Sequence, residues 1–234
     1  MNKFITAIKN IDIEAIERLL TKEPQWLTWA EEDGKNALHY LGGVVIASRP
    51  GKEEASLQIL RLFVENGMDI NAIHRIKDGC GYFPATPLWY AYTRGRNKTL
   101  YTWLLNNGAN PGNCMFAIAW YDDAEAAELF KYHGADIDDA SIGETPVMAA
   151  INWKKFAVAE WFLKNGANAN TADKDGNTCL HQAVKRKYPP KIIELLLKYG
   201  ADPNQENKAG ASPKSIARQQ RPPVLMALFD KAVS

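Results

Sequence analysis

The sequence has few of the residues that build metal centres and disulfide frameworks, and it has no long apolar run. Its 234 residues include three cysteines and four histidines, and no two cysteines form a CxxC pair. An odd number of widely spaced cysteines argues against a disulfide framework and indicates reduced thiols. No apolar stretch approaches the roughly 18 residues that a membrane-spanning helix needs. We therefore expect neither a metal site nor a membrane span.

An excess of charge of one sign is also missing. The chain carries 28 basic and 27 acidic residues, so its formal net charge is +1. This balance provides no overall attraction to nucleic acid or anionic lipid. Nucleic-acid binding would depend on one short basic segment, residues 185–191, and is the weaker alternative. The first residues form too short an apolar run for a signal peptide. We therefore expect a cytoplasmic protein, with export by another route left open.

Motifs that carry catalysis are absent as well. The sequence contains no phosphate-binding GxxxxGK[ST], no GxSxG and no HExxH. The histidines are 35, 59 and 48 residues apart, and these spacings match no zinc pattern. Cys80 lies near His74, but no base and orienting group accompany it, so we interpret it as an ordinary thiol. We predict no catalytic residue and no cofactor.

What the sequence does contain is a repeated phrase of glycine, a small or apolar residue, and Asp or Asn. Each copy follows an apolar run of helical type, and a glycine at that position can adopt the left-handed conformation that ends a helix. The copies are spaced by 41, 26, 32 and 34 residues. They begin at Gly67, Gly108, Gly134, Gly166 and Gly200.

A second phrase opens each unit. In its clearest copies Thr86 and Thr145 precede a proline, and Thr178 precedes Cys179. A threonine there caps a helix through its side chain, and proline fits the first turn. Weaker copies begin at Asn36 and Ser212. An alanine lies five residues after four of these starts and lets neighbouring helices approach closely; these alanines are Ala91, Ala150, Ala183 and Ala217.

The two alternating phrases resemble the ankyrin repeat, whose signature is Thr-Pro-Leu-His-x-Ala with Gly-Ala-Asp about twenty residues later. The resemblance covers residues 32–217 and is to small ankyrin repeat proteins of bacterial type. It implies an all-α solenoid of about seven stacked helix-turn-helix units, caps included, with short finger loops. It also implies that His39 and His181 bind the backbone of neighbouring loops. The expected single domain 1–234 divides into an N-cap 1–31, repeats 32–72, 73–111, 112–138, 139–170 and 171–204, and a C-cap 205–234.

Three places depart from this pattern. The first repeat has an inserted loop at 42–56, the second has a long finger at 73–85, and the third lacks its finger after Gly108. Insertions in surface loops cost little free energy, so neutral drift is one interpretation. The other is that these loops shape a binding site. The exposed aromatic tip of the long finger favours the second interpretation.

The resemblance also predicts where a partner binds, because ankyrin proteins use finger tips and the inner face of each first helix. The helix positions lie seven and eight residues after each opening threonine. Trp, Tyr and Arg dominate protein–protein hot spots, although packing between helices is the alternative for the aromatic residues. The predicted residues are Arg94, Trp120, Tyr121, Asn152, Trp153, Lys185 and Arg186 on helices and Tyr82, Phe83, Glu144 and Lys174 on fingers, with Asp33, Lys35, Ile142, Asp175 and Asn177 as further finger positions.

These observations predict a non-enzymatic monomer that binds a partner protein in a concave groove, as an adaptor or an inhibitor. An acidic run between Asp122 and Asp139, followed by the basic segment 185–191, would give the groove a dipole that orients the partner. Two further roles are open. One is a secreted effector that mimics host ankyrin scaffolds. The other is a regulator or immunity partner of an enzyme encoded by a neighbouring gene.

Overall fold

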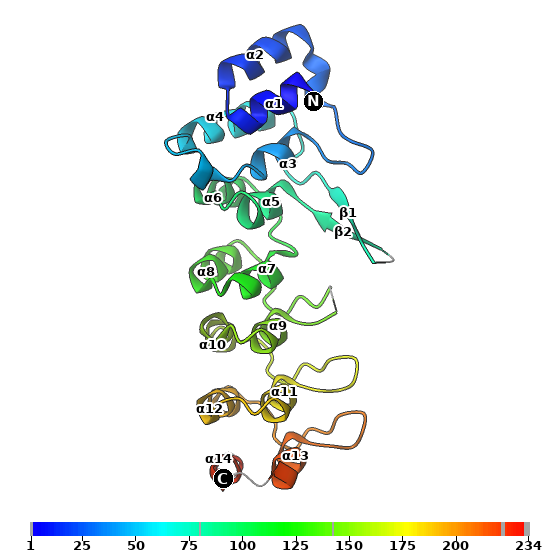
Figure 1. The fold of residues 1–234 in the computed structure, drawn as a ribbon, viewed down its shortest axis with the longest axis vertical. Coiled ribbons are helices and arrows are strands. Elements are labelled where there is room, and N and C mark those ends of the chain that lie inside the picture. Colours follow the sequence, from blue (N-terminus) through cyan, green and yellow to red (C-terminus); the bar gives the residue numbers. More distant parts are fainter. Residues whose placement is uncertain (1, 80, 142, 221–222, 232–234) are drawn as a thin grey trace. The chain divides into compact units, whose positions relative to one another are not determined.

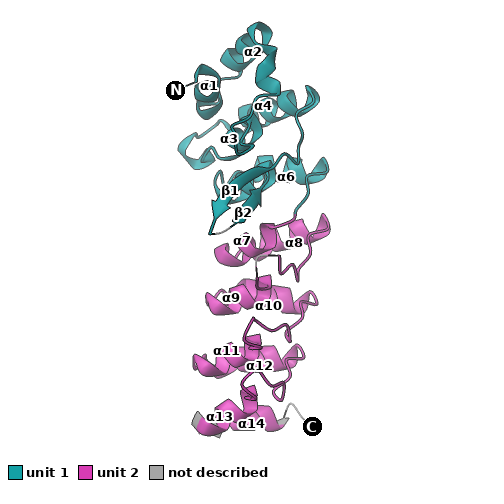
Figure 2. Cartoon of the chain, turned by 90° about the vertical axis from the view of Figure 1, so that its right-hand side faces the viewer, with its two compact units in different colours: residues 1–111 teal, residues 112–234 magenta. Residues whose placement is uncertain are grey.

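The computed structural model describes residues 2–79, 81–141, 143–220 and 223–231. The chain forms two compact units, residues 1–111 and residues 112–234 (Figure 2). Both consist of consecutive helix pairs, as the repeat pattern predicts. The assignment of the whole chain to a single domain stays a prediction. Within the described ranges, no helix combines the length and hydrophobicity that crossing a bilayer requires.

Unit 1 contains three helix pairs and one β-hairpin. The first helices of its pairs contact one another in succession along one row, and the second helices do so along another (Figure 1). Its helices are α1 (Lys3–Asn10), α2 (Ile13–Lys22), α3 (Ala37–Gly42), α4 (Glu53–Glu65), α5 (Pro87–Thr93) and α6 (Lys98–Asn106). Short 3-10 helices span Pro24–Leu27 and Ile46–Ser48, and the hairpin strands are β1 (His74–Asp78) and β2 (Gly81–Ala85).

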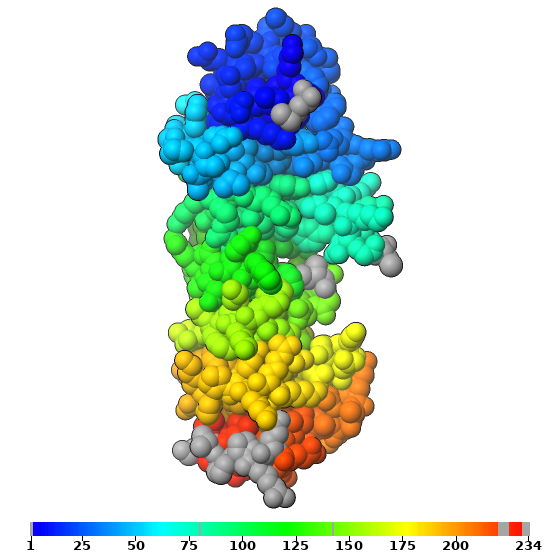
Figure 3. Space-filling view, in the orientation of Figure 1, coloured from blue at the N-terminus to red at the C-terminus, as the bar shows by residue number. Residues whose placement is uncertain are grey.

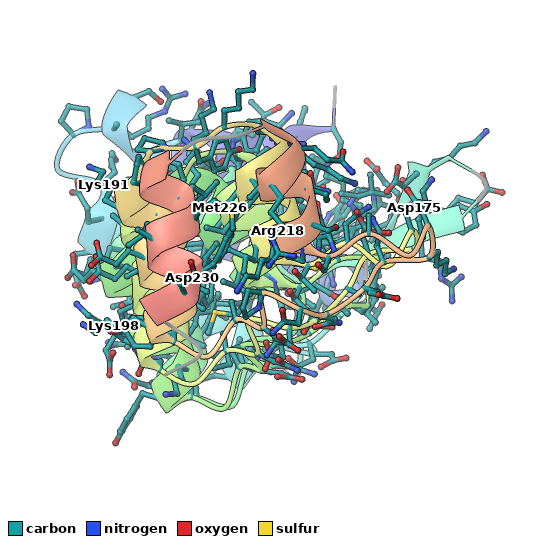
Figure 4. The ribbon with its side chains drawn as sticks, turned by 90° about the horizontal axis from the view of Figure 1, so that it is seen from below. Asp175, Lys191, Lys198, Arg218, Met226 and Asp230 are labelled. Atoms are coloured by element: carbon teal, nitrogen blue, oxygen red, sulfur yellow. The ribbon has the colours of Figure 1, made fainter. Side chains whose placement is uncertain are left out.

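Unit 2 contains four helix pairs. Its helices are α7 (Cys114–Tyr121), α8 (Ala124–Tyr132), α9 (Pro146–Asn152), α10 (Phe156–Lys164), α11 (Cys179–Lys185), α12 (Pro190–Lys198), α13 (Pro213–Gln220) and α14 (Pro223–Lys231). The first helices form one row with the finger loops beyond it, and the second helices form the other row (Figure 1). Seen from the C-terminal end, Lys191 and Lys198 lie on the α12 side and Asp175 lies at the opposite, finger side (Figure 4).

Small residues and glycines place the helices as the sequence predicts. The four alanines at the fifth position after each helix start are completely buried between neighbouring helices. The five repeated glycines adopt φ values of 84° to 94°, so each one ends a helix in the left-handed region. Both predictions from the repeat pattern are therefore confirmed.

The histidines of the opening phrase join each helix start to the loops beside it. His39 Nε2 lies 3.1 Å from the carbonyl oxygen of Ala72 and 3.2 Å from that of Ala85. His181 Nε2 lies 2.9 Å from the carbonyl oxygen of Ala211. The predicted binding of loop backbone by both rings is confirmed. Burial lowers the pKa of His39 from 6.5 to about 4, so this ring is neutral at pH 7.

Helix capping follows the prediction at two of the three clear threonines. The Thr86 hydroxyl accepts a hydrogen bond from Trp89 N at 3.2 Å, and Thr178 forms a reciprocal capping box with His181. Thr145 does not cap its helix, and its buried hydroxyl has no hydrogen-bond partner among the described residues. The prediction is therefore wrong at Thr145. Met148 replaces the histidine there, which excludes a capping box but does not explain the absent cap, because Thr86 caps its helix with Trp89 at that position.

The irregular segments of unit 1 have defined structures. The inserted segment lies between α3 and α4 and includes the short helix Ile46–Ser48. The long finger is an antiparallel hairpin in which His74 faces Ala85 and Asp78 faces Gly81; its tip residue Cys80 lies outside the described residues. The hairpin projects on the same side as the loop that precedes α3, as the colours of Figure 3 show, and Arg75 N donates to Asp33 O at 2.8 Å.

Candidate functional site

The C-terminal ends of the first helices in unit 2 carry the residues that the repeat register predicts. Each residue lies in the last turn of α7, α9 or α11, or at the position that follows it. We call this set the helix-end surface. It consists of Trp120, Tyr121, Asn152, Trp153, Lys185 and Arg186.

The aromatic part of this surface is a contact between neighbouring repeats. Trp120 is 53% exposed, and its ring meets the ring of Trp153 edge-on, with 4.9 Å between the centroids. Trp153 also packs edge-on against Phe116 at 4.7 Å, so one of its sides is buried and the other borders Trp120. Tyr121, which is 39% exposed, extends the apolar area. We call Trp120, Tyr121 and Trp153 the aromatic ledge. It is preformed, because the half-buried Trp153 supports the exposed ring of Trp120.

Capping fixes the backbone beneath this ledge. Asp122 follows the last residue of α7 in the left-handed conformation, with φ of 57°. Its carboxylate accepts a hydrogen bond from Val158 N at 2.9 Å, which ties the end of α7 to the first turn of α10. Asp138 accepts from Asn168 N at 3.1 Å, and Asp139 accepts from Ser141 N at 2.9 Å. Much of the acidic run therefore satisfies backbone donors instead of forming a free negative patch.

The polar part of the surface surrounds the end of α9. Arg186 donates to the main-chain oxygen of Asn152 at 2.8 Å, where a positive charge complements the helix C-terminus. The Asn152 amide donates to Glu144 at 2.9 Å, and its side-chain oxygen is buried without a partner among the described residues. Lys185 donates to Asn177 at 2.6 Å. Both basic residues are exposed and held in place by these bonds.

The fingers of unit 2 are ordered turns. Asp173 accepts hydrogen bonds from the backbone N–H groups of Asp175 and Asn177 at 2.9 and 2.8 Å. Burial acts to raise the pKa of Asp173, but these hydrogen bonds outweigh it and hold the pKa below its usual value. Lys174 is exposed on the turn. Ile142, predicted on the preceding finger, lies outside the described residues.

Besides the finger positions Asp33 and Lys35, three predicted residues belong to unit 1. Tyr82 is 67% exposed on the hairpin. Phe83 packs against Trp89, with 5.1 Å between ring centroids, so it contributes to folding the finger back on α5. Arg94 is exposed at the end of α5, and its guanidinium carbon lies 5.6 Å from the centroid of the Trp89 ring. Of the three, Tyr82 and Arg94 present accessible side chains.

Sequence reasoning missed a polar network under the hairpin. His74 Nε2 lies 3.0 Å from Asp33 Oδ2, and its Nδ1 lies 2.7 Å from the hydroxyl of Tyr90. The histidine is buried, and the network joins the first finger loop, the hairpin and α5. His74 is thus engaged structurally and is not available as a base for Cys80. Its position at the start of the long finger was visible in the sequence, but its partners are 41 and 16 residues away.

A comparison with protein families decides the identity of the repeats. The model of the family "Ankyrin repeats (3 copies)" matches residues 114–207. Residues 114–207 are ankyrin repeats by this match, and the chain has the ankyrin solenoid fold. Ankyrin repeat domains are protein–protein interaction modules, and they bind other proteins. The matched residues contain the helix pairs from α7 to α12, so the helix-end surface belongs to the matched part of the chain.

Known ankyrin proteins share both sequence and fold with this chain. The mouse B-cell lymphoma 3 protein homolog is 32% identical over 99 residues, which are 42% of this chain and 22% of the mouse protein. An ankyrin repeat protein of fowlpox virus is 30% identical over 167 residues, 69% of this chain and 40% of the viral protein. The chain therefore spans less than half the length of either relative.

The crystal structure of the ankyrin repeat domain of Bcl-3, described as a unique member of the IkappaB protein family, superposes with a TM-score of 0.75. It is 22% identical in sequence, and the match covers 98% of each chain. At this level of identity, the similarity shows the ankyrin fold and no particular partner.

Proposed function

We propose that this protein is a non-enzymatic interaction module that binds a partner protein on the helix-end surface of unit 2, as an adaptor or an inhibitor. The observation that carries the proposal is the contact of the exposed Trp120 with Trp153. A tryptophan buries up to about 250 Å² when covered, so exposure of Trp120 leaves a large apolar area in water. A partner that covers it recovers this free energy.

The surroundings of the ledge support the same proposal. Arg186 and Lys185 are exposed at the next helix end and are already oriented by hydrogen bonds. A partner therefore loses less conformational entropy in ordering them than it would with free side chains. An apolar centre flanked by oriented basic groups is the usual composition of a protein–protein hot spot.

Affinity capture with matched variants tests the proposal. The tagged protein, Trp120→Ala and Tyr132→Ala are compared in capture from a lysate of the source organism, and the affinity of the captured protein is then measured with purified components. Tyr132 is the control because it is 84% exposed on α8, in the other helix row. We expect Trp120→Ala to weaken binding about 30-fold, the effect of a hot spot of about 2 kcal/mol. The Tyr132 variant should bind like the original protein.

Two results would contradict the proposal. One is a partner whose affinity is unchanged in Trp120→Ala, and the other is a partner that Tyr132→Ala weakens equally. A circular dichroism spectrum of each variant verifies that the helices are intact. Because Trp120 is more than half exposed, its replacement is expected to leave the fold unchanged.

A further inference from the structure

Unit 1 contains a basic pocket of about 430 Å³ next to the inserted segment. Four cationic side chains line it, each from a different part of the unit: Lys9 lies in the last turn of α1, Lys35 precedes α3, Arg49 belongs to the inserted segment and Arg94 follows α5. The rings of Tyr40 and Tyr90 lie among them, and no Asp or Glu of the described residues lines the pocket. We call this site the basic pocket.

The wall that the inserted segment contributes is closely fitted to the rest of the unit. Ile46 N donates to Gly95 O at 3.1 Å, and the Ile46 side chain is 9% exposed. A Cβ atom on Gly95 would lie 2.2 Å from Gly42 O and 3.0 Å from Val44 O. The 2.2 Å distance is shorter than real Cβ contacts, so a side chain at this position would require the backbone to shift. The pocket is therefore a built feature of the fold and is not merely a gap under a loose loop.

No direct ion pair opposes the positive charge of the pocket within the described part of the unit. No ion pair joins any of the four cations to a described carboxylate. Glu31 accepts a hydrogen bond from the Tyr40 hydroxyl, and Asp33 binds His74 and attracts Lys35 only electrostatically, so neither acid forms a salt bridge with the pocket. Lys35 and Lys9 lie over the ring of Tyr40, at 4.5 and 5.3 Å from its centroid. Cation–π contacts of this kind hold the ammonium groups in place while leaving their charge intact.

We propose that the basic pocket binds the oxyanions of an acidic peptide segment, either carboxylates or phosphoryl groups. Its volume falls within the range of roughly 300 to 1,000 Å³ that small-ligand pockets have. Two arginines and two lysines around one cavity match the way acidic and phosphorylated motifs are recognised. This site is separate from the helix-end surface. The inference rests on the proposed interaction role in one respect, that the anionic groups belong to a peptide.

A nucleic acid fits the pocket less well than a peptide does. Binding of single strands needs free aromatic faces on which bases stack. Tyr40 is in contact with two lysines, and Tyr90 is 8% exposed and lies nearly parallel to His74, with 5.7 Å between the ring centroids. Both rings are therefore already occupied. The basic pocket is also an open hollow of about 430 Å³ within one unit, which differs from the extended basic groove that follows a nucleic-acid backbone.

Fluorescence anisotropy with the full chain tests the inference. The labelled probes are an oligoglutamate peptide, a phosphoserine peptide, an oligoglutamine peptide of the same length, and oligouridylate. We expect the two anionic peptides to bind, more weakly as salt increases, and the oligoglutamine peptide not to bind. The anionic peptide that binds with the higher affinity shows whether the pocket prefers carboxylates or phosphoryl groups. Replacing Arg49 and Arg94 together by Gln should weaken peptide binding about tenfold for each arginine.

A matched variant distinguishes the effect of the pocket arginines from the effect of lowering the net positive charge of the chain. Lys191→Gln with Lys198→Gln also removes two positive charges, from exposed positions on α12 in unit 2 (Figure 4). This control should bind the peptides like the original chain, and so should Trp120→Ala, which tests the other surface. The inference is overturned if neither anionic peptide binds, if the lysine and arginine pairs weaken binding equally, or if oligouridylate binds more tightly than both peptides. Lys9→Gln provides an independent variant, since Lys9 lies in a different helix, α1.

Discussion

Acidification should destabilise unit 1 through His39. This ring is completely buried, and burial lowers its pKa from 6.5 to about 4 in the folded protein. Because the folded pKa is below the unfolded one, protons bind the unfolded chain first. The stabilisation is therefore complete above pH 6.5 and is lost as the pH falls towards 4. The linkage relation gives a loss of about 2.5 kcal/mol between about pH 7.5 and about pH 4.5.

The assay is urea unfolding at a series of pH values, followed by both circular dichroism and tryptophan fluorescence because repeat arrays can unfold in steps. The informative variant is His39→Gln, which cannot titrate. We expect its free energy of unfolding to be lower at neutral pH, since buried carbonyl groups lose a donor, and to depend less on pH than that of the original protein. Between about pH 7.5 and about pH 4.5, the original protein should therefore lose about 2.5 kcal/mol more of its free energy of unfolding than His39→Gln does.

Leu38→Ala is the matched control. Leu38 is completely buried on the same helix, so its truncation should cost about 2 to 5 kcal/mol without removing a titrating group. It also identifies the unfolding transition that reports on α3. The reasoning is refuted if His39→Gln keeps the full pH dependence of the original protein, or if Leu38→Ala loses it to the same extent.

Three further predictions concern packing. Gly95→Ala should lower the free energy of unfolding by about 1 to 3 kcal/mol, because its Cβ would lie 2.2 Å from a backbone oxygen; an unchanged melting temperature would contradict this. Thr145→Val should raise stability by up to about 1 kcal/mol, because the buried hydroxyl has no partner, and a lower melting temperature would argue against it. The buried thiols of Cys114 and Cys179, whose pKa values burial raises, should resist a thiol reagent in native buffer and react in urea when tested in Cys80→Ser. Rapid native labelling would exclude this burial.

The regular part of the fold could be predicted because local sequence determines it. A glycine must end each helix, and an alanine must lie between neighbouring helices, so both leave a fixed spacing in the chain. The contacts of His39 and His181 follow from the same register. Residues at the helix ends, such as Trp120 and Arg186, could also be placed by counting from the repeat.

The remaining contacts depend on pairings that spacing does not encode. His74 binds Asp33 and Tyr90 only because the hairpin and the preceding finger loop lie side by side. Asp122 was counted as part of an acidic face, whereas it accepts a backbone hydrogen bond from α10. Thr145 has the sequence of a cap, but its hydroxyl accepts no hydrogen bond from its own helix. Each case needs a tertiary neighbour to be known before the role of the side chain can be assigned.

In the inserted segment of unit 1, the extra length of the loop and its close packing against the rest of the unit have different explanations. Neutral drift accounts for extra length, because a longer surface loop costs little free energy and needs no particular contact. It does not account for the fit of Gly95 against Gly42 and Val44, where a single methyl group would overlap a backbone oxygen. The same segment also brings Arg49 to a cavity that already holds three cations. Like charges in one pocket destabilise the folded chain unless an anion occupies it, so this arrangement favours a binding function for the insertion over drift.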